Sequence, residues 1–100
     1  MIIYNVTVNV DDSIHDEWLK WSREIHIPEV LNTGMFRECR LCKVISSEDT
    51  GTTYSFQYTC ESKEKYEKYI REFAPALRQT VSEKFGDKFI AFRTLLEVIE

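Results

Sequence analysis

The sequence contains few residues that break regular structure: three glycines and two prolines among 100 residues. A disordered or low-complexity segment is therefore excluded, because such segments are rich in Gly and Pro and poor in apolar side chains. Hydrophobic residues make up 43% of the chain and aromatic residues 13%. The length fits one globular domain, and we expect a single domain over residues 1–100.

The chain also lacks an excess of positive charge. Thirteen Lys and Arg against seventeen Asp and Glu give a formal net charge of -4, and the basic residues are scattered. We expect no binding to nucleic acid, because phosphate contacts require a basic face. No apolar run reaches the roughly 20 residues of a membrane-spanning helix. We therefore expect no membrane association, and because the N-terminal residues do not have the pattern of a signal peptide, we expect none.

Cysteine is scarce and odd in number, with Cys39, Cys42 and Cys60. This count does not suit a disulfide framework, and free thiols fit the reducing cytoplasm. The spacing Cys39-x-x-Cys42 resembles a metal or redox motif. On a strand, however, residues three apart point to opposite faces, which suits neither zinc nor a disulfide. We therefore predict a cytoplasmic protein with no metal and no other cofactor.

The period of the hydrophobic residues predicts a strand and then a helix in the first third of the chain. Residues 2–10 alternate between apolar and polar side chains, as in a strand with one buried face. After capping residues at 11–13, a helical stripe follows, formed by Ile14, Trp18, Trp21 and Ile25. Pro28 is expected to interrupt this helix, and Gly34 to end a short helical piece after it.

The remaining sequence predicts two strands, a helix and a last strand. Residues 35–45 and 53–60 are predicted to be strands, joined by a polar hairpin loop over residues 46–52. A helical stripe then runs from Tyr66 to Phe85, with Pro75 expected to kink or split it. Residues 89–99 form the last predicted strand.

The order βαββαβ predicts an α+β fold of ferredoxin-like type. Two right-handed βαβ halves give a four-stranded antiparallel sheet, in the order 4-1-3-2, with both helices on one face. The covered face is predicted to hold Tyr4, Val6, Val8, Tyr54, Phe56, Tyr58, Phe92 and Leu96. The open face is predicted to hold Asn5, Thr7, Asn9, Ser55, Gln57, Thr59, Arg93, Leu95 and Glu97.

The polar side chains of the predicted open face suggest a partly enclosed surface. They are mostly small amides and hydroxyls. A sheet face that contacts only water would usually carry Lys or Glu instead. A two-fold homodimer is the commonest protein assembly. We predict that two sheets pack face to face in such a dimer and enclose a small polar chamber.

Four stretches of the sequence resemble a small bacterial family of unknown function in the dimeric α/β-barrel superfamily. They are MIIYNVTV at 1–8, WLKW at 18–21, HIPEVLNTGMF at 26–36 and YSFQY at 54–58. The resemblance covers most of the chain and implies a ferredoxin-like fold and a homodimer. It implies no activity, because that family has none assigned. The wider superfamily includes cofactor-free monooxygenases, haem-degrading enzymes, muconolactone isomerase-like proteins and ligand-binding regulators.

His26 is the sharpest candidate for a catalytic residue. It lies just before the predicted break at Pro28, and its ordinary pKa near neutrality suits a general base or a ligand-binding group. In the alternative interpretation, His26 caps the carbonyls at a helix end, where the helix dipole favours its charge. Asn5 is the second catalytic candidate, since the resemblance to the wider superfamily includes monooxygenases that carry a functional Asn on the first strand.

The predicted ligand-binding residues are Asn5, Asn9, Gln57 and Arg93. They would line the chamber on the open face, with Arg93 as the charge partner of a small polar or anionic molecule. Alternatively, the same side chains form hydrogen bonds across the dimer interface, and Arg93 pairs with Glu97 of either subunit.

Three functions remain open from the sequence. The first is a cytoplasmic homodimer that binds a small polar or anionic molecule in the chamber. The second is a cofactor-free monooxygenase or isomerase acting on a conjugated substrate, with His26 as base and Asn5 or Arg93 stabilising the developing oxyanion. The third is a structural or regulatory dimer without chemistry.

Overall fold

The structure is a computed structural model that describes residues 1–45 and 50–100. The elements follow in the order β1 (Ile2–Val10), η1 (Asp12–Ile14), α1 (His15–Trp21), η2 (Ser22–His26), α2 (Ile27–Leu31), β2 (Glu38–Lys43), β3 (Thr52–Cys60), α3 (Lys63–Glu72), α4 (Ala74–Phe85) and β4 (Phe89–Glu97). Most of the predicted hairpin loop over 46–52 falls on residues 46–49, which lie outside the described residues. None of the helices in the described ranges has the length and apolar character that crossing a membrane requires.

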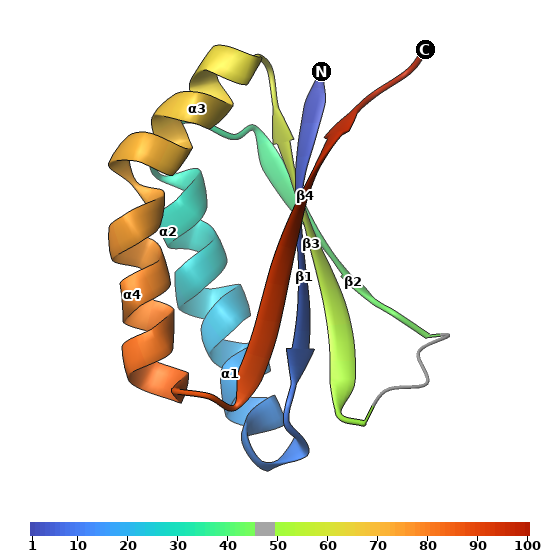
Figure 1. Cartoon of the computed structure of the whole chain (residues 1–100), viewed down its shortest axis with the longest axis vertical. Coiled ribbons are helices and arrows are strands. Elements are labelled where there is room, and N and C mark those ends of the chain that lie inside the picture. The colour runs from blue at the N-terminus through green and yellow to red at the C-terminus, as the bar shows by residue number, and fades with distance from the viewer. Residues whose placement is uncertain (46–49) are drawn as a thin grey trace.

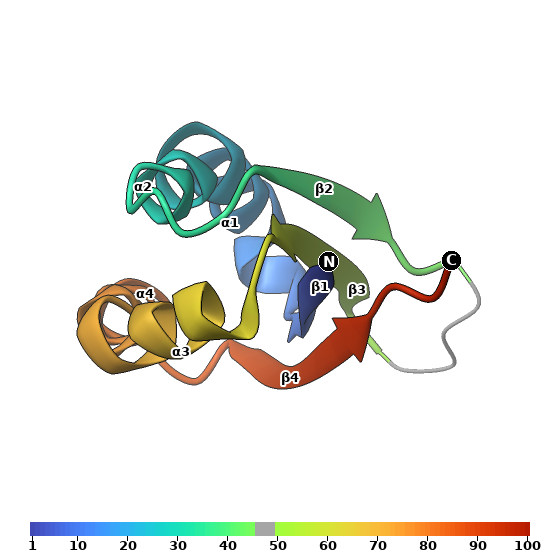
Figure 2. The same ribbon diagram turned by 90° about the horizontal axis from the view of Figure 1, so that it is seen from above.

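The strands form one antiparallel sheet in the order β2-β3-β1-β4, and the helices lie on one side of it (Figure 1). This confirms the predicted ferredoxin-like fold. The helix-covered face carries the aromatic core, including Tyr4, Tyr54, Phe56 and Tyr58. Viewed from above, α1 and α2 lie towards the β2 side of the sheet and α3 and α4 towards the β4 side (Figure 2).

The predicted faces of β4 are wrong. Val6 stands directly opposite Arg93 in the ladder, and residues opposite one another share a face of the sheet. Arg93, Leu95 and Glu97 therefore lie on the helix-covered side, whereas Phe92 and Leu96 lie on the open face. Both sides of this strand carry large apolar side chains, so hydrophobicity did not fix which side faces the core. The pairing register with β1 decides it.

Pro28 does not interrupt the first helical region, contrary to the prediction. Proline has no N–H, and its ring clashes with the carbonyl four residues before it. Immediately before Pro28 the backbone widens into a π-helical turn, η2, in which the Ile27 N–H donates to the Ser22 carbonyl. In this wider turn the N–H groups bond to carbonyls five residues earlier instead of four. The changed pairing lets the helix continue through the proline.

The π-helical turn also moves the buried stripe of this helix. Ile25, predicted to continue the stripe, is 45% exposed, whereas Ser22 is only 1% exposed. An extra residue in the turn rotates the following side chains by about a quarter turn or more around the axis. The inward-facing line becomes Trp18, Ser22, His26 and Val30, and two polar residues thereby occupy its centre.

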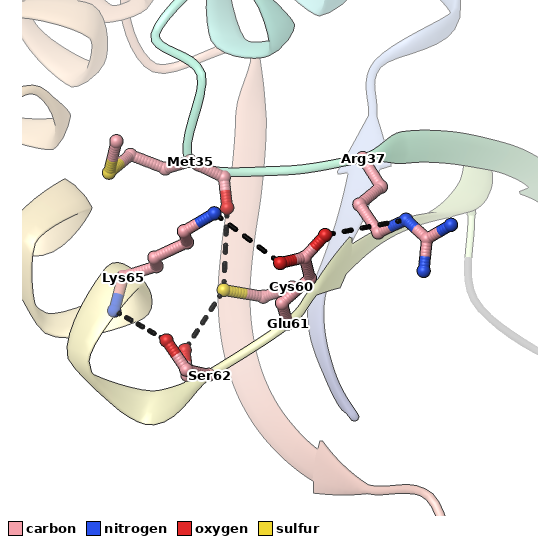
Figure 3. A network of polar contacts seen from close by, with 6 residues as sticks. All are labelled: Met35, Arg37, Cys60, Glu61, Ser62 and Lys65. Carbon is pink, nitrogen blue, oxygen red and sulfur yellow. Dashed lines mark hydrogen bonds and ion pairs between the residues drawn. The ribbon is translucent and has the colours of Figure 1, made fainter.

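The second helical region behaves as predicted. Pro75 splits it into α3 and α4, and Gly86 ends α4 with a positive φ of 61°. The start of α3 is tied to the preceding chain by a local network (Figure 3). The Ser62 hydroxyl caps the helix by accepting from the Lys65 N–H at 3.2 Å, and the buried Cys60 thiol lies 3.4 Å from the Met35 carbonyl. This network fixes the point at which the chain leaves β3 to cover the sheet.

Candidate functional site

A cavity of about 300 Å³ lies between the sheet and the two helical regions. This volume is at the small end of the range for ligand-binding pockets. Most of its wall is apolar or aromatic, with Trp18, Trp21, Val8 and Phe56 among the lining residues. The polar side chains around it come from the sheet and from both helical regions, and they are Tyr4, Tyr58, Tyr69, Ser22, His26, Arg78, Ser82 and Arg93.

Two arginines converge on one phenol in the wall of this cavity. Arg78 of α4 and Arg93 of β4 each donate a hydrogen bond to the hydroxyl oxygen of Tyr4 at 3.1 Å. Each guanidinium has five N–H donors, so both retain donors for a further acceptor. In the part of the chain that the structure describes, neither arginine forms an ion pair with a carboxylate, so Arg93 does not pair with Glu97 of its own chain. The result is a cationic cluster that could bind an anion.

His26 lies in the same cavity and is uncharged at neutral pH. Its ring stacks on Trp21, with centroids 5.1 Å apart and planes 19° apart. Burial, and to a lesser degree the charge of Arg93, lower the pKa of His26 to about 4. This argues against the alternative in which a charged His26 caps the helix end. A neutral imidazole can instead accept or donate a hydrogen bond within the cavity.

Ser22 is the most buried polar residue of the cavity wall. It is 1% exposed, and its hydroxyl has no hydrogen-bond partner among residues 1–45 and 50–100. An unsatisfied buried hydroxyl costs on the order of 1–3 kcal/mol. Sequence reasoning did not single out this serine, because it did not predict the π-helical turn that buries it.

Asn5, Asn9 and Gln57 lie on the opposite face of the sheet from this cavity. Asn5 accepts a hydrogen bond from the Ser55 hydroxyl at 2.5 Å, and Gln57 donates to that same hydroxyl at 3.3 Å. Asn9 donates to the Thr50 carbonyl at 2.9 Å. These amides bond mainly to side chains of their own face, and Asn9 also bonds to the backbone of Thr50 in the same chain.

The predicted site residues therefore divide into two groups. The structure brings His26 and Arg93 together in the cavity on the helix-covered side. Asn5, Asn9 and Gln57 form a separate patch on the open face, so one chain does not place all five around a single chamber. The predicted chamber is wrong in this respect because Arg93 points the other way.

Sequence reasoning missed Tyr4 and Arg78 as site residues. The alternation of the first strand predicts Tyr4 to lie in the core, and it is buried there, but it also lines the cavity, and its hydroxyl accepts from Arg78. Arg78 follows Leu77 and precedes Val81 on the side of α4 that lines the cavity. The signal in the sequence was the positive charge of Arg78 next to the apolar stripe of this helix, which could have indicated a site residue.

The second histidine lies outside the cavity. His15 bridges the Asp16 carboxylate at 2.8 Å and the Tyr54 hydroxyl at 2.6 Å. Burial and the charge of Asp16 raise the pKa of Tyr54. Because this contact joins the start of α1 to β3, we interpret it as structural.

The cysteine pair has the geometry expected from its spacing. Cys39 stands opposite Tyr58 and Cys42 opposite Ser55, so the two thiols lie on different faces of the sheet. Burial raises the pKa of Cys39 to about 11, which keeps it a thiol. In the described residues, no group of three or more His, Cys, Asp or Glu side chains could hold a metal ion.

The sequence profile of the Domain of unknown function (DUF4286) matches residues 1–99. The chain belongs to this family. No curated protein matches it in sequence. The family description assigns no activity, so function depends on the site itself.

Solved structures share the DUF4286 fold at low sequence identity. An EthD-family protein from Bacillus halodurans superposes with a TM-score of 0.75 at 10% identity, over 99% of this chain and 100% of that one. The haem degrader MhuD from Mycobacterium tuberculosis, with two haems in its active site, gives 0.73 at 16%, over 100% and 97%. A dimeric ferredoxin-like protein from an uncultured marine organism gives 0.70 at 18%, over 99% and 94%. These similarities establish the fold alone.

The lowered pKa of His26 predicts a loss of stability in acid. The unfolded chain binds a proton near the ordinary histidine pKa of 6.5 and the folded chain only near 4, so the unfolding free energy falls as pH drops between these values. The full effect is on the order of 3 kcal/mol. Urea unfolding of wild-type and His26→Asn protein, near pH 7 and near pH 4.5, should show a smaller acid loss in the variant.

The matched control is Ser82→Ala, a substitution at the same cavity that removes no titratable group. It should retain the wild-type dependence on pH. Equal acid losses in wild-type and His26→Asn protein would show that His26 titrates normally and is not buried as described.

Proposed function

We propose that this DUF4286 protein binds a small organic anion in the cavity between its sheet and helices, and that it does so as a homodimer. The observation that carries the proposal is the convergence of Arg78 and Arg93 on the Tyr4 hydroxyl, with neither arginine in an ion pair in the described part of the chain. The proposed ligand class is the one expected from the sequence, but its site lies on the other face of the sheet.

The cationic cluster favours a carboxylate or a similar planar anion. A guanidinium matches a carboxylate through two parallel hydrogen bonds, and such charge-assisted bonds are stronger than neutral ones. Arg78 and Arg93 are largely exposed, so they stand at the entrance, where water screens part of the attraction. Charge therefore orients the anion, and further affinity must come from the apolar interior.

The interior of the cavity favours a flat apolar body on that anion. Trp21 and Phe56 offer aromatic surface, and Val8 and Val81 aliphatic surface. Burying apolar area contributes about 25 cal/mol per Å², and aromatic faces add stacking. We therefore expect aromatic or otherwise conjugated acids to bind more tightly than short aliphatic ones.

The open sheet face supports the homodimer. Ile90 and Phe92 are 71% and 61% exposed, although they occupy a β-strand. The central amides Asn5 and Gln57 each donate one hydrogen bond within the chain, so a second copy that covers them has to satisfy only their remaining donors. One similar structure is described as a dimeric ferredoxin-like protein. The free thiols of the three cysteines support a cytoplasmic location for the dimer.

A second candidate function is a cofactor-free monooxygenase or isomerase. It is favoured by the neutral imidazole of His26 beside a cation, since His26 could take a proton from a conjugated substrate while Arg93 stabilises the resulting anion. An anion bound at Arg93 would neutralise the charge of Arg93. The pKa of His26 would then rise towards neutrality, where a general base works best. Asn5 lies on the other face of the sheet and has no role in this version within one chain.

We expect Arg78→Met and Arg93→Met each to weaken binding of aromatic carboxylates by about tenfold or more, because a hydrogen bond to a charged group is lost. Isothermal titration with aromatic acids and with their neutral primary amides measures this. The amides should bind weakly, and neither substitution should affect them much. Arg71→Met, at an arginine of α3 paired with Glu72, is the control. Equal binding of acids and amides would contradict the anion proposal.

The dimer is tested by placing a charge on the open face. Phe92→Glu should give a monomer of 11.9 kDa in sedimentation equilibrium, where the wild type gives twice that mass. The control is Ile25→Glu, since Ile25 is an exposed apolar residue on the helical layer. That variant should remain dimeric. A monomeric wild type at micromolar concentration would refute the dimer.

Turnover separates the enzyme from the binding protein. With an acidic conjugated substrate that binds the wild type, oxygen uptake or an isomerised product should appear and should disappear in His26→Ala. Circular dichroism shows whether the variant keeps its fold. Activity that survives in the folded His26→Ala variant would remove His26 from the chemistry, and tight binding without any turnover would favour the binding protein.

A further inference from the structure

The inner end of the cavity carries a hydroxyl that the protein itself does not satisfy. Ser22 is almost fully buried, lines the cavity, and finds no partner for its hydroxyl among the described residues. A helical serine commonly bonds back to the carbonyl four residues earlier. Here the Trp18 carbonyl accepts from the Ser22 N–H, which also donates to the Leu19 carbonyl, and the side chain remains unpaired.

A π-helical turn of the backbone places Ser22 in the wall of the cavity. Ser22 opens the π-helical turn that allows Pro28 to remain within the helix, and π-helical turns occur often at functional sites. One turn further along the same inward line lies His26, a neutral group that can also donate or accept. Ser22 and His26 thus interrupt an apolar stripe at neighbouring positions.

The polar groups of the cavity wall consequently differ in character. Arg78 and Arg93 are exposed and cationic, whereas Ser22 is buried and neutral and His26 is half-buried. Much of the remaining lining is aromatic and aliphatic, with Trp21 and Phe56. A ligand that satisfies both kinds of polar group must carry an anion and, at another position, a neutral hydrogen-bonding group.

We propose that Ser22 forms an inner subsite that hydrogen-bonds a hydroxyl or carbonyl group of the ligand, with His26 beside it, and that the ligand is a flat conjugated acid carrying this group at the end remote from its carboxylate. This inference rests on the proposed function, because the carboxylate must first be held by Arg78 and Arg93. A site built to bond such a group discriminates against the analogue that lacks it, since its own polar atoms are then left unpaired.

Matched ligand pairs test the subsite. Benzoate, phenylacetate and phenylpropionate are each compared with the para-hydroxylated acid by isothermal titration, so that three lengths are sampled. For the length that fits, the wild type should bind the hydroxylated acid about tenfold more tightly. Ser22→Ala should abolish that preference and leave the affinity for the unsubstituted acid within about twofold. Ser82→Ala, which removes an exposed cavity hydroxyl of α4, should keep the preference.

The stability of the free protein gives a second readout. Because the Ser22 hydroxyl is unsatisfied, Ser22→Ala should unfold at the same temperature as the ligand-free wild type or higher. A lower unfolding temperature would mean that the hydroxyl serves the fold, and would overturn the inference. Ser22→Cys keeps a weaker donor of similar size, and it should retain only part of the preference for the hydroxylated acid.

The outcomes separate this inference from the function on which it rests. If phenyl acids bind in an Arg93-dependent way but hydroxylation has no effect at any length, the inner subsite is wrong and the anion site stands. If the preference persists in Ser22→Ala, the hydroxyl is recognised by another group and the assignment to Ser22 is wrong. If no acid of either series binds, both proposals fall together.

Discussion

The pairing register between β1 and β4 is the constraint on which the rest of this structure depends. Val6 opposite Arg93 sets the phase of the whole last strand. In that register Arg93 reaches the Tyr4 hydroxyl under the helices, and Phe92 is turned to the bare face of the sheet. A slip by one residue would exchange the two sides, since side chains alternate with a period of two. The cationic cluster would then be lost from the cavity, and the open face would gain a charge where it now has an aromatic ring.

A second constraint acts within the first helical region, where Pro28 and the π-helical turn form one unit. A regular helix would meet the proline with a steric clash, and the wider turn avoids that clash. The same turn brings Ser22 and His26 to the inner side of the helix and turns Ile25 outward. Two polar side chains are thereby buried in place of an apolar one. This costs stability, because a buried hydroxyl lacks a partner within the described residues and a buried imidazole resists protonation. Local rules broken in this way are typical of functional positions rather than of structural ones.

Sequence periodicity was sufficient to predict the helices and strands and their order. It failed where the two faces of a strand have similar hydrophobicity, so that either could face the core. The strand at 2–10 and the split at Pro75 follow from alternation and from proline chemistry, which act locally. The faces of β4 were not predictable, because Ile90 and Phe92 compete with Ala91 and Leu95 for the core and only long-range pairing decides between them. Of the candidate site, His26 and Arg93 could be named from their chemistry. Their meeting in one cavity, and the roles of Tyr4, Arg78 and Ser22, depend on tertiary contacts that no short window of sequence contains.

The two faces of β4 also connect the proposed dimer to the proposed site. Along this strand, cavity residues alternate with open-face residues, so that Ala91 and Arg93 are separated only by Phe92. β4 is an edge strand, paired on one side only within the described sheet, and its second half is exposed on both faces in the single chain. A partner seated on Phe92 would hold the backbone that carries Arg93, and so would fix the guanidinium before an anion arrives. Preorganisation of this kind raises affinity by removing the cost of ordering the site on binding. In the proposed dimer, assembly and ligand binding would be linked through β4, although the surfaces proposed for the two lie on opposite sides of the sheet.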